Sequence, residues 1–535
     1  MIAHARSATR TVATAVMLAL GLSGVAACPP KDRPAAADAG APSDTPFALT
    51  PWDEAARDAA IAAGAAVLRK HQCARCHTVD AIEAPARPLH CTSCHVFLKG
   101  LDPRKEEWAK LEKKYGKGIL ERYQRNIEHL RDVPSLTLLG ARVRGDWILA
   151  FLREPHDVRP LLGESMIRHA LTADEITTLG RYFAAMARAP DPTAAGYAPP
   201  RLPPRPDAAR LEEGRRVFSA KGCAGCHTFG NVDLGVPLVQ LESARSVAAL
   251  APNLRHVRDR TRPEILVAWI MDPRSVAPWT TMPNVSVSRG EAEALRDFLL
   301  FADPALAAAP PPPSLEPPAL LARPVPYEEM KERVLGRVCV HCHMNDHEKD
   351  PGPGNRGGLG FRGQELQLRT YEALVSGYVD ATGKRVSALV PRPGERAAPL
   401  VLAMLRRRLE ARRDQIAPFA DHALPPYPKD GLRGMPLGLP TMRDEEIALL
   451  ATWIAQGCKG PANVSGTPGV YDGYLVPDGP IARNEGCELR APDKKRPAWV
   501  VETEKAAAAA SASATPAASG TTPPAGPSAG SPKRP

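Results

Sequence analysis

The stretch KGCAGCHT, residues 221–228, contains the pattern Cys-x-x-Cys-His, which indicates the fold and the chemistry to expect of this chain. The pattern occurs four times, at residues 73–77, 91–95, 223–227 and 339–343. In a chain of 535 residues with 11 cysteines and 14 histidines, roughly 0.006 such strings are expected by chance. The four copies therefore mark four sites of the same chemistry.

Cys-x-x-Cys-His is the attachment signature of c-type haem. The two thiols add to the vinyl groups of the haem, and the adjacent histidine binds the iron as proximal ligand. The sequence thus predicts four covalently bound haems. The predicted attachment and ligand residues are Cys73, Cys76 and His77; Cys91, Cys94 and His95; Cys223, Cys226 and His227; and Cys339, Cys342 and His343.

Residues 1–27 have the pattern of a signal peptide, with Arg6 and Arg10 ahead of an apolar run over 12–27. Residues 25–28, Val-Ala-Ala-Cys, resemble the lipobox of bacterial lipoproteins, which implies a lipid on the sulfur of Cys28. The alternative is an ordinary cleavage site followed by an unrelated cysteine. We expect export to the periplasmic side of the bacterial cell envelope, and Pro29 favours the outer membrane over the inner one.

No later segment reaches 18 consecutive apolar residues, so we expect a soluble mature chain apart from its lipid anchor. The formal net charge is +10. Each haem carries two propionates, so four haems would offset most of that charge. The charge therefore predicts no nucleic-acid partner.

Proline-rich segments at 189–206 and 304–326 divide the chain, and the second contains four consecutive prolines typical of a semi-rigid spacer. They separate three predicted folded units: 52–188 with two haem motifs, and 207–303 and 327–460 with one each. The predictions for the remaining segments are a flexible tether at 28–51, a C-terminal extension at 461–503 and a disordered tail at 504–535.

Each unit has a helix-like stretch before its motif and a methionine loop before a final helix. A Ser or Thr with an acid three residues later predicts the start of that helix, as a capping box where the acid is Glu. The pairs are Thr172 and Glu175, Ser288 and Glu291, and Thr441 and Asp444. Apolar residues follow at helical spacing, namely Ile176, Leu179, Tyr182 and Phe183; Leu295, Phe298 and Leu299; and Ile447, Leu450 and Ile454. Strand signals are sparse, so the predicted fold is mostly α.

The units resemble class I cytochrome c domains, in which two helices, a Pro-x-Leu turn and a methionine loop surround one haem. The resemblance rests on the haem motifs, on Pro252-Asn-Leu254 with Met282-Pro283, on Pro134-Ser-Leu136 with Met166, and on Met435-Pro436. Ile167 stands where the usual proline would follow Met166. The resemblance covers roughly two thirds of the chain. It implies a multihaem c-type cytochrome lipoprotein with three such domains in tandem.

A methionine thioether is a soft, neutral ligand that favours ferrous iron and raises the haem potential. We predict Met166, Met282 and Met435 as the sixth ligands of the haems at His77, His227 and His343, respectively. Met442 is the rival of Met435. The alternative for each is a methionine that only fills space in the core.

The second motif is unusual because only 14 residues separate Cys76 from Cys91. That spacing approaches a zinc ribbon, but a histidine follows each cysteine pair, which favours haem. The sixth ligand of this haem is not evident: His129 is the first choice, and the alternatives are His71, His90, His156 and His169. An empty sixth position is the remaining possibility, and an open iron can bind small ligands.

Cys458 and Cys487 are left outside the motifs, and we predict a disulfide between them because an oxidising compartment permits it. The leading functional hypothesis is a tetrahaem cytochrome that relays single electrons between membrane or periplasmic redox partner proteins, and is not an enzyme. The alternative is a haem enzyme of the peroxidase or nitrogen-oxide reductase type, with the second haem as active site. A third possibility is a cytochrome subunit of a larger complex.

Overall fold

The structure, a computed structural model, describes residues 50, 52–115, 118–127, 130–159, 162, 164–169, 171–234, 250–306, 314–343, 366–380, 382–415, 433–461, 470–471, 474–475 and 487. The predicted signal peptide, Cys28, His129 and the tail at 504–535 lie outside these residues, as does the tether up to residue 49. All described residues belong to one compact unit. None of their helices is long and apolar enough to cross a membrane.

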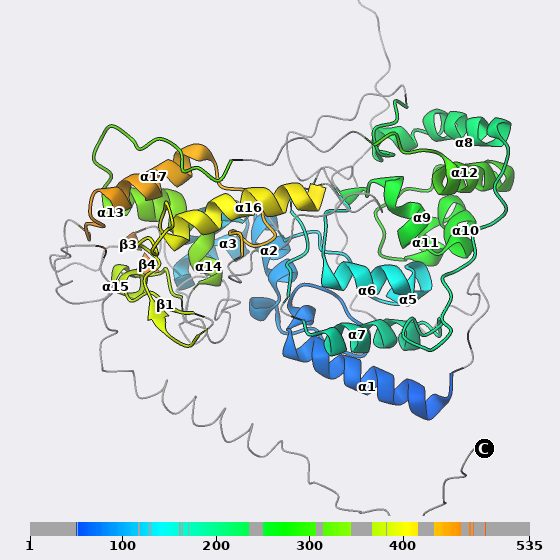
Figure 1. The fold of residues 1–535 in the computed structure, drawn as a ribbon, viewed down its shortest axis with the longest axis horizontal. Coiled ribbons are helices and arrows are strands. Elements are labelled where there is room, and N and C mark those ends of the chain that lie inside the picture. Colours follow the sequence, from blue (N-terminus) through cyan, green and yellow to red (C-terminus); the bar gives the residue numbers. More distant parts are fainter. Residues whose placement is uncertain are drawn as a thin grey trace, which may run out of the picture. The chain divides into compact units, whose positions relative to one another are not determined.

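The described residues are mostly helical, which confirms the predicted fold class (Figure 1). Their strands form two short antiparallel ribbons. In one, β1 (Tyr378–Val379) pairs with β2 (Arg385–Val386); in the other, β3 (Val470–Tyr471) pairs with β4 (Tyr474–Leu475).

The N-terminal part is built around the crossing of its first and last helices. The elements are α1 (Glu54–Lys70), η1 (Cys73–Arg75), η2 (Arg87–Leu89), α2 (Cys91–Gly100), α3 (Glu106–Tyr115), α4 (Ile119–Asn126), α5 (Leu139–Arg142), α6 (Gly145–Arg153) and α7 (Ala173–Met186). Leu68, Leu179 and Tyr182 are buried where α1 meets α7. A second cluster, with Leu98 and Tyr123, joins α2 to α4.

In the middle part of the chain, residues 207–303, the first and last helices again pack against each other. Its elements are α8 (Ala208–Ala220), η3 (Cys223–Gly225), η5 (Leu254–His256), α9 (Val257–Arg260), η6 (Pro263–Ile265), α10 (Leu266–Met271), α11 (Pro273–Val276) and α12 (Arg289–Phe301). Helices α8 and α12 pack together over Phe218 and Phe298, which are both buried.

The third part has the largest hydrophobic cluster, centred on Trp453, Tyr371 and Met330. Its elements are α13 (Tyr327–Met330), the π-helical segment η7 (Lys331–Cys339), α14 (Val340–Cys342), α15 (Tyr371–Val375), α16 (Pro399–Gln415) and α17 (Asp444–Ala455). Cys458 is fully buried at the end of this cluster and forms a disulfide with Cys487.

Two of the three predicted helix starts are confirmed and one is wrong. Thr172 and Ser288 cap α7 and α12 in capping boxes with Glu175 and Glu291. Thr441, however, does not cap the last helix, because α17 begins at Asp444 and its cap position is Arg443. The reason is Glu446: its buried carboxylate accepts a hydrogen bond from the Arg443 backbone N–H at 2.9 Å and pairs with Arg337.

The predicted apolar faces of these three helices are confirmed. In α7 and α12 all seven predicted positions are buried. In α17, Ile447 and Leu450 are fully buried, and Ile454 is partly buried against the same cluster. The predicted apolar positions thus face the core, although α17 is buried on all sides, since residues 446–453 are all buried.

Substitution of Glu175 by alanine is expected to destabilise the fold by about 1 kcal/mol at pH 7, since the capping box is lost. Glu175 accepts from Lys70 Nζ at 2.6 Å and from the Thr172 N–H at 2.9 Å. These bonds lower the pKa of Glu175 from 4.5 to about 2. A lowered pKa in the folded state means that the contribution is present above pH 4.5 and is lost as pH falls toward 2.

Urea unfolding at pH 7 and at pH 3 tests this prediction. The difference between the wild type and Glu175→Ala should shrink at the lower pH. Glu175→Gln is the matched control, because it keeps a neutral acceptor for the Thr172 N–H and has no charge to titrate. An equal difference at both pH values would show that the carboxylate charge plays no part.

Candidate functional site

The first Cys-x-x-Cys-His motif lies in a tight turn that follows α1. The helix ends and Gln72 adopts a left-handed backbone with φ of 55°, after which η1 carries Cys73. His77 Nδ1 lies 2.8 Å from the carbonyl oxygen of Pro134. A carbonyl oxygen can only accept, so Nδ1 carries the proton and Nε2 keeps the lone pair that binds a metal.

The third motif has the same construction in the middle part of the chain. Gly222 has a left-handed φ of 74°, η3 carries Cys223, and His227 Nδ1 donates to the Pro252 carbonyl at 2.9 Å. The residue after each histidine also bonds the Pro-x-Leu segment: Leu136 N–H donates to Thr78 O at 2.9 Å, and Leu254 N–H donates to Thr228 O at 2.8 Å. The Pro-x-Leu segments thus orient the proximal histidines.

Asn253 strengthens the segment that holds His227. Its side-chain oxygen accepts from the N–H groups of Gly230 at 3.0 Å and Arg255 at 3.1 Å. The turn after the motif and the Pro252 carbonyl are therefore tied together by one side chain. Such outer partners fix the orientation of a metal-binding histidine.

The fourth motif differs because the helix before it is not interrupted. The α13 helix continues through η7 into α14, which ends at Cys342, and π-helical turns are frequent at functional sites. His343 Nδ1 lies 3.3 Å from Leu366 O, and Leu368 N–H donates to His343 O at 2.9 Å. Leu366 and Leu368 thus take the places of the Pro and Leu of the other two sites.

The role of the Leu366 carbonyl was not predicted from the sequence, because Leu366 stands where the Pro-x-Leu pattern has a proline. A signal was present in the spacing: Leu366 lies 23 residues after His343, and Pro252 lies 25 residues after His227. The corresponding spacing from His77 to Pro134 is 57 residues. The second Cys-x-x-Cys-His motif and the helices α2 to α4 fill that longer interval.

The three histidines with carbonyl partners are neutral at neutral pH. Burial lowers the pKa of each of them, His77, His227 and His343. A histidine binds a metal through the lone pair of its neutral ring. These three sites are therefore prepared to bind a metal through Nε2.

The second motif lies in a helix and not in a turn. Helix α2 begins at Cys91, and His90 caps it by accepting from the Ser93 N–H at 3.1 Å. Cys91, Cys94 and His95 are each less than a tenth exposed. The Thr92 hydroxyl donates to Cys76 O at 2.9 Å, so the first and second motifs adjoin.

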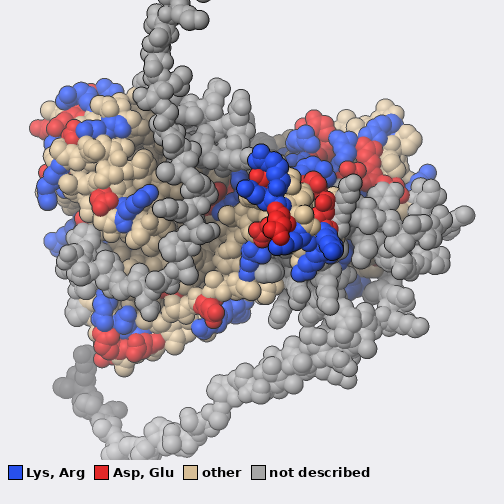
Figure 2. All heavy atoms as spheres, turned by 180° about the vertical axis from the view of Figure 1, so that it is seen from behind, with Lys and Arg blue, Asp and Glu red and all other residues tan. Residues whose placement is uncertain are grey.

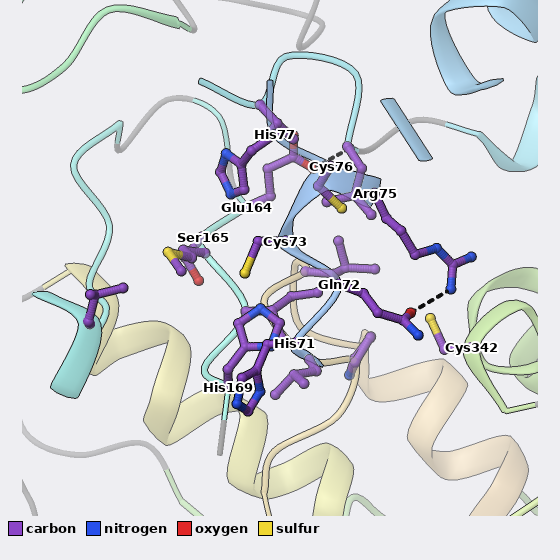
Figure 3. A pocket seen from close by; sticks show the side chains of 18 of the residues that line it. His71, Gln72, Cys73, Arg75, Cys76, His77, Glu164, Ser165, His169 and Cys342 are labelled. Atoms are coloured by element: carbon purple, nitrogen blue, oxygen red, sulfur yellow. Dashed lines mark hydrogen bonds between the residues drawn. The ribbon is translucent and has the colours of Figure 1, made fainter. Parts of the chain in front are cut away.

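One cavity of about 1650 Å³ opens beside the first motif (Figure 3). It is lined by residues of both the first and the fourth motifs and by the two methionines predicted as their sixth ligands. These residues are Cys73, Cys76, His77 and Met166, and Cys339, Cys342, His343 and Met435. Met442, the rival of Met435, is also in the lining.

Three of the histidines considered for the second haem line this cavity. They are His71, His156 and His169. His71 Nε2 lies 3.2 Å from Glu175, and the His71 and His169 rings meet edge to face with centroids 6.0 Å apart. Residues 91–95 do not line the cavity, so these three histidines share it with the first and fourth motifs and not with the second.

Met282 lies on the segment between α11 and α12, in the same part of the chain as the third motif. Its side chain is half-buried, and its backbone N–H donates to the Thr280 hydroxyl at 3.2 Å. Met282 does not line the large cavity.

Three arginines from two parts of the chain, Arg142, Arg159 and Arg260, line the same cavity. Burial lowers the pKa of Arg142 and of Arg260 to about 10, so both remain charged at neutral pH. After burial, the largest effects on the pKa of Arg260 come from the positive charges of Arg142 and Arg159, which lower it. Acidic side chains already act on the other two, Asp80 on Arg142 and three carboxylates on Arg159, whereas Arg260 is influenced only by like charges. A buried cation beside like charges is stabilised by an anionic partner, and Arg260 is the arginine of this cavity that such a partner would suit.

No group of three or more His, Cys, Asp or Glu side chains among the described residues is arranged to hold a metal ion, the first two motifs included. Comparisons with family models, with characterised proteins and with solved structures found no match to this chain.

Proposed function

We propose that this protein is a c-type cytochrome with four covalently attached haems, which relays single electrons between redox partners of the bacterial cell envelope. The observation that carries the proposal is the repeated support of the motif histidines. His77, His227 and His343 each donate Nδ1–H to a backbone carbonyl and keep Nε2 for a metal. A bound haem supplies a one-electron ferric–ferrous couple.

The residues of the large cavity fit such a group. Cysteine pairs stand beside each oriented histidine, and Met166 and Met435 supply neutral thioethers. Arg260 is a buried cation suited to the carboxylates of haem propionates. The lining would therefore provide thiols for attachment, histidine and thioether ligands for iron, and charge neutralisation for a flat, largely apolar dianion.

A relay function needs little else from the protein. An electron arrives from a one-electron donor and leaves to a one-electron acceptor, and no bond is made or broken. The chain must only hold the axial ligands, exclude water and set the potentials. On the face shown in Figure 2, acidic and basic side chains are interspersed.

Haem content tests the proposal directly. The full chain should be produced in a bacterium that attaches c-type haem, and the haem that survives acid–organic extraction should be counted. We expect four per chain, and three after Cys223→Ala with Cys226→Ala. Cys458→Ala with Cys487→Ala is the matched control, which should keep four. A chain without extraction-resistant haem would overturn the proposal.

Carbon monoxide separates a relay from the alternative enzyme with the second haem as active site. A relay with filled coordination should bind none in the reduced state. Binding at one haem that is lost after Cys91→Ala with Cys94→Ala would instead assign an open iron to residues 91–95.

The predicted lipid anchor is part of the same proposal, because it would hold the relay near its membrane or periplasmic partners. Substitution of Cys28 by serine is the test. The protein is expected to move from the membrane fraction to the soluble fraction with its four haems retained. Retention of the variant in the membrane fraction would contradict the anchor and leave the haem proposal intact.

Substitution of Arg260 by glutamine is expected to lower the potential of one haem by roughly 60 mV, a tenfold change in the electron-binding constant. The guanidinium lines the cavity, and a nearby positive charge favours the reduced form of the iron. Spectroelectrochemical titration measures the shift. Arg289→Gln is the control, since that side chain is 79% exposed. Equal curves for both variants would remove Arg260 from the site.

A further inference from the structure

We propose that residues 73–77 and 339–343 hold their two haems in one shared cavity, as an interacting pair, while residues 223–227 hold a separate haem. This inference rests on the proposed function and adds an arrangement that the order of the motifs along the chain does not suggest. The first and fourth motifs are the most distant in sequence, yet they line the same space.

The size of the cavity is the first argument. Sites for a single small ligand or cofactor usually measure about 300–1000 Å³. The cavity here measures about 1650 Å³ and has a complete set of attachment and axial residues from each of the two motifs. Both the volume and the lining of the cavity therefore correspond to two haems and not to one.

The two methionine loops are joined directly, which is the second argument. The Ser165 N–H donates to Gly438 O at 2.8 Å, and the Arg433 guanidinium donates to Arg168 O. Gly438 has a left-handed φ of 69°, and a Cβ at this position would lie 2.8 Å from Ser165 O. Met166 and Met435 therefore stand on two loops that pack as one wall of the cavity.

The attachment cysteines also approach one another. Cys76 of the first motif and Cys342 of the fourth both line the cavity. Figure 3 shows Cys342 on the side of the cavity where Gln72 and Arg75 lie. The attachment points of the two groups are thus near each other.

A shared cavity has a measurable consequence. The first electron to enter the pair reduces one ferric iron to ferrous, and the change in charge acts on the second iron across a medium of low dielectric constant. Two sites that interact in this way titrate as a pair and not independently. The second electron should bind roughly tenfold less tightly than the first, which corresponds to about 59 mV for one electron.

Redox titration of the full chain tests the pairing. The variant Cys339→Ala, Cys342→Ala, His343→Ala should lose one haem and shift the midpoint of one remaining haem by this tenfold factor. The matched control is Cys223→Ala, Cys226→Ala, His227→Ala, which should lose one haem and leave the other midpoints unchanged. If the two triple variants alter the remaining midpoints equally, the pairing is wrong, whereas a haem count below four in the unmodified chain contradicts the proposed function instead.

A measurement on the unmodified protein covers the case in which a triple variant does not fold. In the fully oxidised state, two adjacent ferric haems should couple magnetically, so the paramagnetic resonance signal should integrate to fewer than four independent haems. Gly438→Val, which pushes the methionine loops apart, should restore signal. Four independent signals from the unmodified chain with four haems would overturn the shared cavity.

Discussion

Met282→Leu is expected to lower the potential of the haem proposed at residues 223–227 by a sizeable part of the roughly 0.8 V range that axial ligands cover. Leucine keeps the volume and the apolar character of methionine, but it has no sulfur to bind iron. The segment around Met282 should therefore fold normally while the sixth position of the iron becomes open. An open ferrous iron binds carbon monoxide.

The measurement combines a redox titration with a carbon monoxide difference spectrum. Met271→Leu is the matched control, because Met271 lies in the same part of the chain and packs against its hydrophobic cluster. It should change neither the potentials nor carbon monoxide binding. If Met282→Leu behaves as Met271→Leu does, then Met282 is a packing residue and another group occupies the sixth position.

Gly214→Val is expected to destabilise the middle part by about 3 kcal/mol and to reduce its haem occupancy, because it forces apart the two helices that carry the core. A Cβ at Gly214 on α8 would lie 2.3 Å from Ala294 O and 2.6 Å from Phe298 Cβ, both on α12. One of these atoms belongs to the backbone of a packed helix, which cannot move aside at low cost.

Thermal unfolding followed by circular dichroism measures this effect, and haem counting measures its consequence. Gly290→Ala is the matched control: Gly290 lies on α12 itself, and a Cβ there meets nothing within 4 Å. It should leave the stability unchanged or raise it slightly, because alanine is preferred to glycine in a helix. Unchanged unfolding of Gly214→Val would show that α8 and α12 do not pack at the distance seen in the structure.

The same crossing occurs between α1 and α7, where a Cβ at Gly64 would lie 2.3 Å from Tyr182 Cβ. Gly64 and Gly214 each lie nine residues before the first cysteine of their motifs, Cys73 and Cys223. A glycine in the middle of a helix costs stability relative to alanine, so it usually has a packing reason. The sequence contained this signal, but only the structure shows which helix approaches.

Local features of the chain were predictable because they depend on residues a few positions apart. The capping boxes at Thr172 and Ser288 need one side chain and one backbone N–H three residues on, and both were predicted correctly. The start of α17 was not, although it is also local: the Arg443 N–H donates to Glu446, three residues on. The pattern used for the prediction required Ser or Thr at the cap, so it selected Thr441 and not Arg443.

The support of the motif histidines was predictable where a proline marked it. Pro134 and Pro252 were recognised in the sequence, and their carbonyls accept from His77 and His227. The Leu366 carbonyl, which accepts from His343, was not predicted, because any residue can supply a backbone oxygen. Every residue has a backbone carbonyl, so a hydrogen bond to this group cannot be recognised from the identity of the residue.

The sequence by itself determined that four Cys-x-x-Cys-His motifs exist, that the described residues are mostly helical and which apolar residues of the final helices contribute to the core. These properties follow from residue type and from a period of 3.6 residues per turn. Only the tertiary structure decided that the first and fourth motifs line one cavity and that the loops of Met166 and Met435 are bonded through Gly438. Whether two segments distant in sequence contact each other depends on how the helices between them pack. Packing depends on the fit of many side chains, which no short pattern of residues encodes.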